Sequence, residues 1–411
     1  MRRKIKRKVA EALFRWACRR PTGRLGSSIL EAFGMRSVRV ANFSDVAAPF
    51  ATVAGQSTSR VEAPRWNEGE PRVRTGDFPP IRARIVQQPV FTISSSAFLQ
   101  DDLLYLPNPV LSDRGRTATA DENLFHLSKN TAVGAISAED EVDSGIFIGG
   151  AGSSNWYHFV IECLPKAYLA QRLPSEFDHL PLLVPEECRR IPSFADALAL
   201  FSGKREVRFL KYNARNFANE LVVFDDVSIG PFNMAPGEWP SIDDYAQHDA
   251  ELQSFIEAFR SNLFADKRPA AAERRIFLQR PPQQRAYNQD EIRAIAERYG
   301  FEPVSPETLS LREQAELFAS ASSVIGASGA AWVGMIFREC PMKALSWLPS
   351  EYSEFCSYSS LARLLGHQLD FIEAKPDKKL QTTGDAFVTG YTVCPAEFEA
   401  ATQRLVRSLE A

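Results

Sequence analysis

The sequence predicts an α/β protein with two parallel-sheet domains. From residue 144 onward apolar strand-like runs alternate with helix-like segments, and this alternation is typical of parallel sheets. A charged segment rich in Pro and Ala, residues 265–275, separates two such sets like a hinge. The chain has 411 residues, which suggests two to three domains, and its 45% hydrophobic and 24% charged residues exclude a disordered protein. We expect the chain to divide into four regions, with the bounds 1–34, 35–143, 144–270 and 271–411.

Residues 1–20 hold nine Lys or Arg and one acidic residue. Ile5, Val9, Leu13 and Trp16 recur at helical spacing, so a helix here carries one apolar stripe. Such a helix can lie on an anionic membrane surface as a weak peripheral anchor. A solvated terminus and a nucleic-acid arm are the alternatives. The region 1–34 is therefore predicted to be a basic amphipathic helix followed by a linker.

Charge, hydropathy and cysteine usage limit the remaining possibilities. The 48 basic and 51 acidic residues give a net charge of -3, which argues against a general polyanion binder and against nucleic acid as a partner. No apolar run reaches 18 residues, so no membrane-spanning helix is expected. The six cysteines show no CxxC spacing, so we expect reduced thiols in the cytoplasm rather than a zinc or disulfide framework.

Residues 35–143 are predicted to be β-rich, with short strands such as Val90–Ile93 and Leu103–Leu106. Before about Phe78 the pattern is weak and a linker is possible. The first alternating set is expected to have strands at Gly145–Ile148, Leu180–Val184, Val207–Leu210 and Leu221–Phe224, and helices at Asn155–Ala170, Ser193–Phe201 and Ser241–Leu263. The second set is expected to have strands at Ile276–Gln279, Phe301–Val304, Ser323–Ala327 and Lys343–Trp347. Its helices are expected after Asn288 and Ser310, each opened by a capping box, and at Ala330–Phe337 and Tyr358–Leu365.

The first candidate site is one helix face. Asn155, His158, Glu162 and Lys166 follow one another at steps of three, four and four residues, directly after the Gly-rich turn 149–155. Glu162 can hold one imidazole nitrogen of His158 and leave the other free to accept a proton. The alternative is a solvated stripe on a half-buried helix. The turn itself matches a dinucleotide fingerprint only weakly.

The second candidate site follows a strand in the second set. Arg280 ends that strand, Arg285 lies in the loop and Asn288 begins the next helix. Guanidinium groups beside a helix N-terminus suit a diphosphate. Two solvated loop arginines are the alternative.

The third candidate site is the turn Gly326–Ala–Ser328–Gly329 before a helix that begins at Ala330. Small residues there let a ligand approach the helix N-terminus closely. Tight packing between strand and helix is the alternative. A serine hydrolase using Ser328, Glu354 and His367 is conceivable, but Ala330 breaks the GxSxG pattern.

Three blocks together carry a family resemblance: 155–169, the segment with Arg280, Arg285 and Asn288, and 310–337. Residues from about 145 to 350 resemble glycosyltransferase family 61, whose bacterial members are linked with capsular polysaccharide synthesis. The resemblance implies a GT-B fold of two facing Rossmann-like domains, the second binding most of a UDP-linked sugar donor. It also implies inverting transfer without a bound metal ion. The chain departs from the family pattern at Ser328, where a His is usual, and at Ser346, where a Glu is frequent.

We therefore expect a glycosyltransferase that builds a surface polysaccharide on the cytoplasmic side of a bacterial membrane. Its partners would be a nucleotide sugar, a glycan or lipid-linked acceptor, and the anionic membrane through residues 1–20. Catalysis is assigned to His158 and Glu162. Substrate binding is assigned to Asn155, Lys166, Arg280, Arg285, Asn288, Gly326, Ser328, Gly329 and Ala330. Because of Ser328 and Ser346, a non-catalytic glycan-binding or scaffold protein is the alternative.

Overall fold

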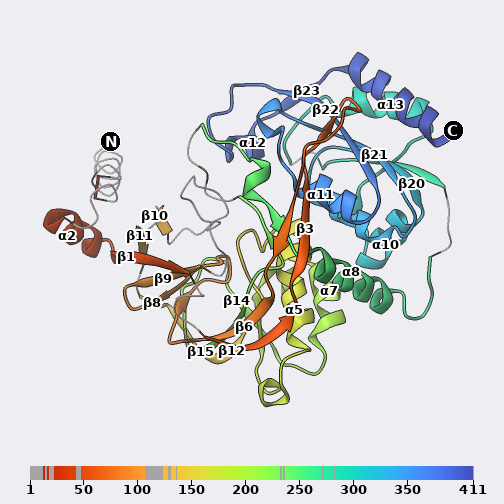
Figure 1. Ribbon diagram of the computed structural model, residues 1–411. Helices are drawn as coiled ribbons and strands as arrows, with labels where there is room; N and C mark the ends of the chain where they lie inside the picture. Colours follow the sequence, from red (N-terminus) through yellow and green to blue (C-terminus); the bar gives the residue numbers. More distant parts are fainter. Residues whose placement is uncertain are drawn as a thin grey trace.

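The protein is a mixed α/β molecule built around two large sheets (Figure 1). The computed structural model describes residues 13, 16–17, 23–42, 48–106, 124–127, 131–135, 137–231, 234, 237–269, 273–281 and 284–410. Apart from Leu13, Trp16 and Ala17, the predicted basic helix 1–20 lies outside the described residues. Helix α2 (Arg24–Ala32) and strand β1 (Met35–Asn42) follow.

The first sheet has 12 strands in the order β10-β11-β1-β9-β8-β7-β15-β12-β13-β14, with β6 pairing β15 and β2. The strands not yet given are β2 (Pro49–Ala54), β6 (Ile81–Gln87), β7 (Val90–Phe91), β8 (Phe98–Gln100), β9 (Leu103–Leu106), β10 (Leu124–Leu127), β11 (Thr131–Ala135), β12 (Asp140–Phe147), β13 (Leu182–Pro185), β14 (Val207–Leu210) and β15 (Asn216–Phe224). Strands β12 to β15 run parallel, whereas β6 and β7 are antiparallel to β15. Strand pairing therefore crosses the predicted boundary between residues 143 and 144.

The second sheet has seven strands in the order β19-β18-β20-β21-β22-β23, with β4 beside β22. They are β4 (Arg65–Trp66), β18 (Arg274–Leu278), β19 (Glu302–Val304), β20 (Ala321–Gly326), β21 (Lys343–Leu348), β22 (Gln368–Pro376) and β23 (Tyr391–Val393). All pairs are parallel except β22 with β23. The four strands predicted for this set are confirmed.

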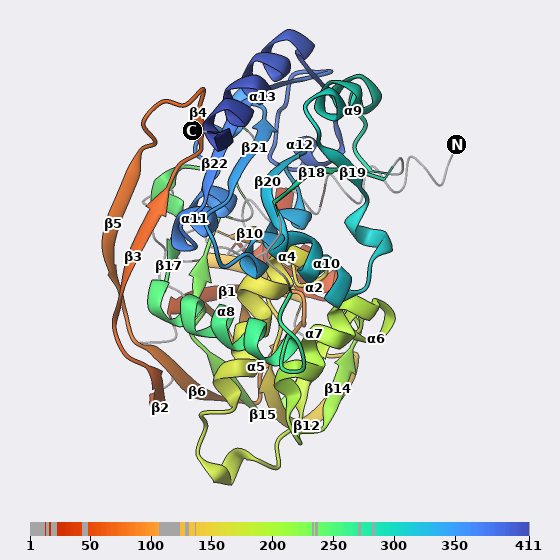
Figure 2. The ribbon, with the colours of Figure 1, turned by 90° about the vertical axis from the view of Figure 1, so that its right-hand side faces the viewer.

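One hydrophobic core joins the helices of the two halves. Figure 2 shows α5 (Leu164–Ala170), α7 (Pro192–Ser202) and α8 (Asp249–Leu263) lying together beside the first sheet. Phe259 of α8 packs against Phe201 of α7, and also against Phe337 at the end of the 3-10 helix η5 (Ala330–Phe337), with ring centroids 5.4 Å apart. The remaining helices are α6 (Glu187–Arg190), α9 (Gln289–Arg298), α10 (Leu311–Ala319), α11 (Ser357–Leu364), α12 (Asp385–Val388) and α13 (Pro395–Glu410). The short 3-10 turns are η2 (Ser175–Phe177), η3 (Ile242–Asp244), η4 (Pro306–Thr308) and η6 (Ser350–Tyr352).

The prediction of a helix over Ser241–Leu263 is wrong at its start, because the helix begins only at Asp249. Ser241 and Asp244 form a capping box that closes the single turn η3. Residues Ala246–Gln247 then form strand β17, which pairs with β16 (Ser228–Ile229). His248 caps α8, where its Nδ1 accepts a hydrogen bond from the Glu251 N–H.

The two predicted capping boxes in the second set differ in outcome. The Ser310–Glu313 box is confirmed, because the Ser310 side chain accepts from the Glu313 N–H and the Glu313 carboxylate accepts from the Ser310 N–H. The capping box predicted at Asn288 is wrong, because the Asn288 side chain makes no capping hydrogen bond to α9. The Asn288 side chain instead bonds to both backbone groups of Val393, and so ties the start of α9 to β23.

Residues before Phe78, for which a linker was possible, form strands in the described range 48–78. Strands β3 (Ser57–Glu62) and β5 (Val73–Phe78) make an antiparallel ribbon that runs the length of the molecule (Figures 1 and 2). Between them β4 pairs with β22 of the second sheet, and after them β6 joins the first sheet. The ribbon thus connects the two sheets.

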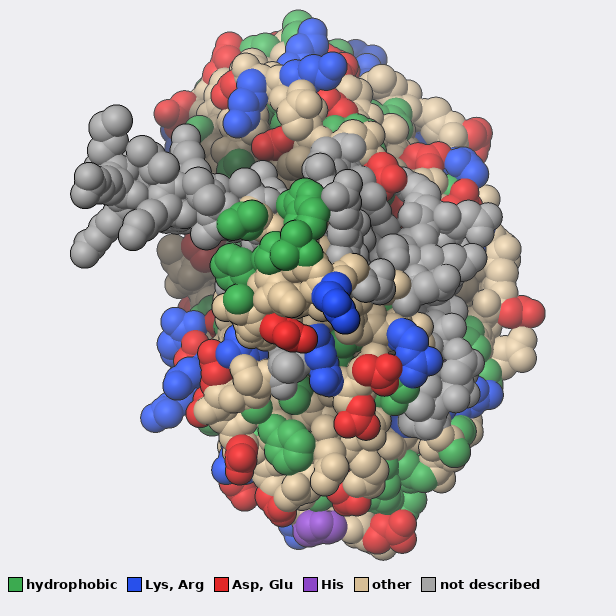
Figure 3. Space-filling model, turned by 90° about the vertical axis from the view of Figure 1, so that its left-hand side faces the viewer, with side chains coloured by type: hydrophobic (Ala, Val, Ile, Leu, Met, Phe, Trp, Pro, Cys, Tyr) green, Lys and Arg blue, Asp and Glu red, His purple; other side chains and the backbone are tan. Residues whose placement is uncertain are grey.

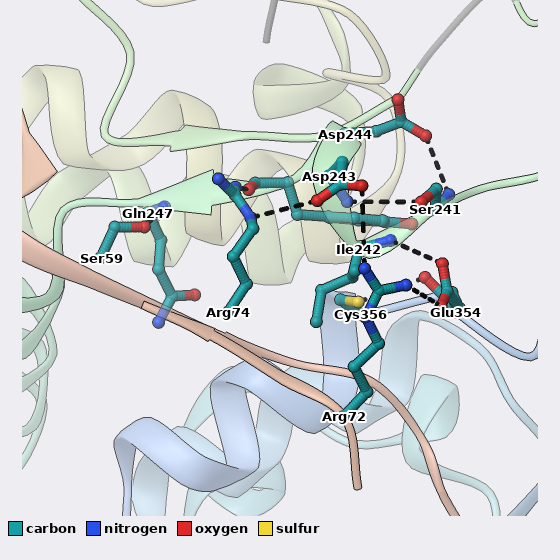
Figure 4. Close-up of polar contacts among 11 residues, drawn as sticks. Ser59, Arg72, Arg74, Ser241, Ile242, Asp243, Asp244, Gln247, Glu354 and Cys356 are labelled. Atoms are coloured by element: carbon teal, nitrogen blue, oxygen red, sulfur yellow. Dashed lines mark hydrogen bonds and ion pairs between the residues drawn. The ribbon is translucent and has the colours of Figure 1, made fainter. Parts of the chain in front are cut away.

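Polar contacts fix one side of the ribbon (Figure 4). The Arg72 guanidinium lies 2.6 Å from the Glu354 carboxylate, which also accepts from the Ile242 N–H. Arg74 donates to the Tyr245 carbonyl oxygen. Glu354 therefore joins three segments that are far apart in the sequence.

Candidate functional site

The His158-bearing helix begins at the carboxyl end of β12. Asn155 caps the short helix α4 (Trp156–His158), with its Oδ1 accepting from the Tyr157 N–H at 2.9 Å. The turn before it depends on Gly152, which has φ +76, and a Cβ there would lie 2.8 Å from the His158 ring. The Gly-rich turn therefore makes room for the imidazole rather than for a dinucleotide.

A π-helical segment, η1 (Phe159–Cys163), separates α4 from α5 within this one helical stretch. Pro165 lies in the first turn of α5, and it has no N–H to bond the carbonyl one turn earlier, which explains the widened turn. Insertions of this kind occur frequently at functional sites.

His158 and Glu162 are in contact, as their spacing predicts. His158 Nδ1 lies 2.9 Å from Glu162 Oε1, and the two side chains are 28% and 15% exposed. Burial disfavours the charged imidazole, but the charge and hydrogen bond of Glu162 outweigh it, so the pKa of His158 is raised. The Glu162 carboxylate thereby fixes the orientation of the imidazole through Nδ1.

Lys166 and Asn155 are engaged in structural contacts and do not join His158 and Glu162 in one site. The Lys166 ammonium is buried, 2.5 Å from Asp226 Oδ1 and 2.8 Å from the Gly149 carbonyl oxygen. These contacts hold α5 against the end of the first sheet. The Asn155 amide is engaged as a helix cap.

Arg280 and Arg285 converge on one atom of the third candidate segment. Both guanidinium groups donate to the Ser328 carbonyl oxygen, at 2.5 and 3.4 Å. Both also lie over the ring of Tyr391, at 5.9 and 5.1 Å from its centroid. Burial and the neighbouring charge of Arg280 lower the pKa of Arg285. Within the described part of the chain, neither arginine has a carboxylate partner.

The glycines near Ser328 have different roles. Gly326 faces Leu278 across the β18–β20 pair, where a Cβ would lie 2.7 Å from the Leu278 Cβ, so tight packing explains it. Gly329 lies beside Arg280, whose Nη2 would be 3.4 Å from an added Cβ, and η5 begins at Ala330. Ser328 and Gly329 therefore lie beside the arginines, whereas Gly326 is engaged in a strand contact and Ala330 begins η5. In the second candidate segment, Asn288 is likewise engaged in contacts with a strand.

A small pocket with a free interior of about 20 Å³ lies beside Arg285 where β21 and β22 end. Trp347 and Tyr391 supply aromatic rings to its lining, and Ala386 and Thr389 come from the segment between β22 and β23. The buried Thr389 hydroxyl has no hydrogen-bond partner among the described residues. The pocket therefore combines apolar walls with one cation and one unused hydroxyl.

Two tyrosines that sequence reasoning missed connect the His158 region with the arginines. Tyr157 and Tyr358 pack edge to face, with ring centroids 5.1 Å apart. Tyr157 precedes His158, and Tyr358 lies near the arginines: burial raises the pKa of Tyr358 to about 12, and the charges of Arg280 and Arg285 oppose that rise. The helix α4 also packs on η5, which follows Gly329. The three predicted segments are thus brought to one region of the molecule. Buried tyrosines carry no periodic signal that distinguishes them from core residues.

The proposed hydrolase residues do not meet. The His367 Nε2 contacts the Met335 carbonyl oxygen, and burial lowers the pKa of His367 to about 4. Glu354 is bound to Arg72 and not to His367. These partners leave no Ser–His–acid arrangement among the three.

No described helix is long and apolar enough to cross a membrane. No group of three or more His, Cys, Asp or Glu residues in the described ranges could hold a metal ion.

Comparison with known proteins relates part of the chain to a family. No curated protein matches the chain. The family model described as Glycosyltransferase 61 matches residues 156–345, a span that contains His158, Glu162, Arg280, Arg285 and Ser328. This match supports placing that part of the chain in glycosyltransferase family 61.

Proposed function

We propose that the protein is a family 61 glycosyltransferase of GT-B type that uses a nucleotide-sugar donor. The family match supports a glycosyltransferase, and that match favours an enzyme over a glycan-binding scaffold. In this proposal the second sheet binds the donor and the first sheet carries the acid–base group. The ligand would lie at the carboxyl ends of parallel strands, as in other open α/β sheets.

The observation that carries the proposal is the pair Arg280 and Arg285. Two half-buried guanidinium groups repel each other, and in the described ranges no carboxylate offsets them. A buried cation without a counter-ion is costly, and an anionic ligand removes that cost. A diphosphate fits because guanidinium groups bind phosphate oxygens through paired hydrogen bonds.

The open side of the neighbouring small pocket is a candidate contact surface for the nucleoside. Its aromatic rings from Trp347 and Tyr391 can contact a base, and the Thr389 hydroxyl can bond to a polar group of the base or ribose. We propose a uridine diphosphate sugar as the donor. Its diphosphate would lie on the arginine side, towards Ser328 and Gly329.

Transfer would follow an inverting displacement. The His158 imidazole would take the proton of the acceptor hydroxyl while that oxygen bonds to the anomeric carbon. The bond from the anomeric carbon to the phosphate oxygen breaks, and its electron pair leaves with the nucleoside diphosphate. Arg280 and Arg285 would stabilise the charge that grows on the leaving phosphate. Glu162 would orient the imidazole and stabilise its protonated form.

We further propose that the acceptor is a glycan or lipid-linked glycan at the cytoplasmic side of a bacterial membrane, as in capsular polysaccharide synthesis. The basic composition of residues 1–20 supports contact with anionic lipid. Figure 3 shows hydrophobic side chains gathered on the face that carries α2, and Leu25 in α2 is 65% exposed. Both features suit a peripheral rather than a spanning attachment.

The proposal is tested by melting the purified protein with UDP and with a panel of nucleotide sugars in excess EDTA. A ligand at a hundredfold excess over its Kd should stabilise the protein by about 2.7 kcal/mol. Persistence in EDTA is expected because the arginines, not a metal ion, bind the phosphates. If no nucleotide diphosphate or nucleotide sugar raises the Tm, the proposal is wrong.

A further inference from the structure

We propose that Tyr391 is a positioning residue that takes the place of a counter-ion for Arg280 and Arg285, and so keeps the two guanidinium groups together and open to an anion. This inference rests on the proposed function, because it assigns the diphosphate of the donor to these two groups.

The side chain of Tyr391 contacts the two arginines in different ways. Its hydroxyl oxygen accepts a hydrogen bond from Arg280 Nη1 at 3.2 Å. The guanidinium carbon of Arg285 lies over its ring, 5.1 Å from the centroid, which is within the range of a cation–π contact. The Ser328 carbonyl oxygen is a second acceptor that both arginines share. One neutral side chain and one carbonyl group therefore hold two like charges side by side.

The neutrality of Tyr391 matters for what the arginines can bind. A carboxylate in this position would offset the positive charge and compete with a phosphate for the guanidinium N–H groups. A phenol ring and its hydroxyl attract a guanidinium group without carrying a net charge, so the pair stays positive. The pKa of Arg285 is lowered by burial and by the charge of Arg280, which agrees with two cations that remain close together.

The side chain of Tyr391 is itself fixed in place. Its hydroxyl oxygen accepts a second hydrogen bond, from the indole N–H of Trp347 at 3.1 Å. The ring of Tyr287 stacks on its ring, with centroids 5.2 Å apart and planes 8° apart. Tyr391 is only 6% exposed, so its ring has little freedom to move. The acceptor that Arg280 uses therefore has a defined position.

The arginine segment is also bound to its surroundings through its backbone. The Tyr391 N–H donates to the carbonyl oxygen of Ala286, the residue after Arg285. The Gln289 side-chain amide accepts from the Arg280 N–H at 2.7 Å and donates to the Arg280 carbonyl oxygen at 3.0 Å. These contacts set the distance from β23 to both guanidinium groups before a ligand binds. Such preorganisation raises affinity, because the ligand does not have to order the groups that bind it.

The substitution Tyr391→Phe separates the hydroxyl from the ring. It keeps the ring beside Arg285, and with it the proposed contact to the base, but it removes an acceptor from Arg280. Arg280 is then free to turn away from Arg285, and an anion has to bring the two groups together again. We therefore expect weaker binding of any diphosphate, with or without a nucleoside.

The test measures the Kd of UDP and the Kd of inorganic pyrophosphate by calorimetry in EDTA. Tyr168→Phe is the matched control. The Tyr168 hydroxyl also bonds to a neighbour, Ser254, and the Arg172 guanidinium lies 4.5 Å from its ring centroid, but Arg172 is paired with the Glu251 carboxylate. Tyr391→Phe should raise both Kd values by the same factor, about fivefold. Tyr168→Phe should leave both within about twofold of wild type.

A double-mutant cycle tests the route through Arg280. Tyr391→Phe should add little to the effect of Arg280→Gln, because both substitutions disrupt the same hydrogen bond. Additive effects would show that the hydroxyl acts elsewhere and would overturn the inference.

The two ligands separate this inference from the proposed function. Unchanged Kd values in folded Tyr391→Phe, or a rise for UDP alone, overturn the inference and leave the transferase standing. Wild-type protein that binds pyrophosphate but not UDP contradicts the nucleotide donor, while the pyrophosphate values still decide the role of Tyr391. Binding of neither ligand by the wild-type protein overturns both. Should Tyr391→Phe not fold, adding Trp347→Phe removes the indole N–H left unpaired, and the same rise in the Kd of pyrophosphate is expected.

Discussion

The imidazole of His158 lies 2.9 Å from the carboxylate of Glu162, one turn along a helix that contains a π-helical segment. The contact raises the pKa of the imidazole despite the burial that opposes its charge. An imidazole must be neutral to accept a proton, so the contact has a measurable consequence for the pH dependence of transfer.

The first prediction concerns Glu162→Gln. Wild-type kcat/KM should rise with pH as His158 loses its proton, and this rise should lie above the ordinary range for histidine because its pKa is raised. Removal of the carboxylate charge should move the rise to lower pH. The measurement is a pH profile of kcat/KM for both proteins. If kcat/KM rises over the same pH range in both proteins, His158 is not the titrating base.

The second prediction concerns His158→Ala, which should lower kcat by about 10²–10⁴ if the imidazole is the general base. The matched control is His179→Ala, because within the described ranges the His179 ring is hydrogen-bonded only to the Glu176 carbonyl oxygen, at an exposed turn. Both variants should melt close to wild type. Full turnover in folded His158→Ala would remove this residue from the mechanism.

The third prediction concerns the phosphate contacts. Arg285→Gln should weaken UDP binding about tenfold or more, since a charged hydrogen-bonded contact contributes about 1.5–3 kcal/mol. Arg298→Gln is the control, because Arg298 pairs with Glu399 at the surface. Titration calorimetry with UDP in EDTA gives both Kd values. Equal affinities for the two variants would contradict the placement of the diphosphate at Arg285.

The fourth prediction concerns the buried pair of Lys166 and Asp226. Lys166→Met leaves Asp226 as a buried charge without this counter-ion and should lower the free energy of unfolding by about 3–5 kcal/mol. The double variant Lys166→Met, Asp226→Leu should recover much of that loss. Denaturant unfolding of the three proteins measures both effects. A destabilisation below about 1 kcal/mol in the single variant would argue for a functional rather than a structural ammonium.

The fifth prediction concerns the N-terminal segment. Deletion of residues 1–20 should release the protein from anionic vesicles, while its Tm and UDP affinity stay unchanged. Salt should weaken binding of the full chain, because exposed charges are screened over about 8 Å at physiological ionic strength. Vesicle flotation measures the bound fraction. Equal binding to neutral and anionic vesicles would contradict the electrostatic explanation.

Periodic elements were predictable from the sequence, and exposed ribbons were not. The strand at Val207–Leu210 and the helix opened by Ser310 follow local apolar patterns and caps. Strand β5 is mostly exposed, so it has no alternation of apolar and polar residues that would reveal it. The first turns before α8 were misjudged because the Ser241–Asp244 box ends its own turn instead of opening a long helix.

In the candidate site, too, the contacts between residues close in the sequence were predictable, and the contacts that depend on the tertiary fold were not. The spacing of His158 and Glu162 within one helix was enough to predict their contact. The arginines were predicted to lie near a strand end, but their shared acceptor, the Ser328 carbonyl oxygen, depends on how β18 and β20 are paired. Tyr157 meets residue 357 across 200 positions of sequence, and no local pattern reports a contact of that range.

The ribbon through β3 and β5 also constrains the order in which the chain can fold during synthesis. Trp66 donates to the Ser353 carbonyl oxygen, 287 residues later, and β4 has its partner in β22. Residues 57–78 therefore leave the ribosome long before the strand that receives them exists. The amino-terminal half cannot be completed first, and its ribbon edges need protection from other chains until the carboxyl-terminal half arrives. Truncations near the carboxyl terminus should consequently cause aggregation through the amino-terminal segment, far from the missing residues.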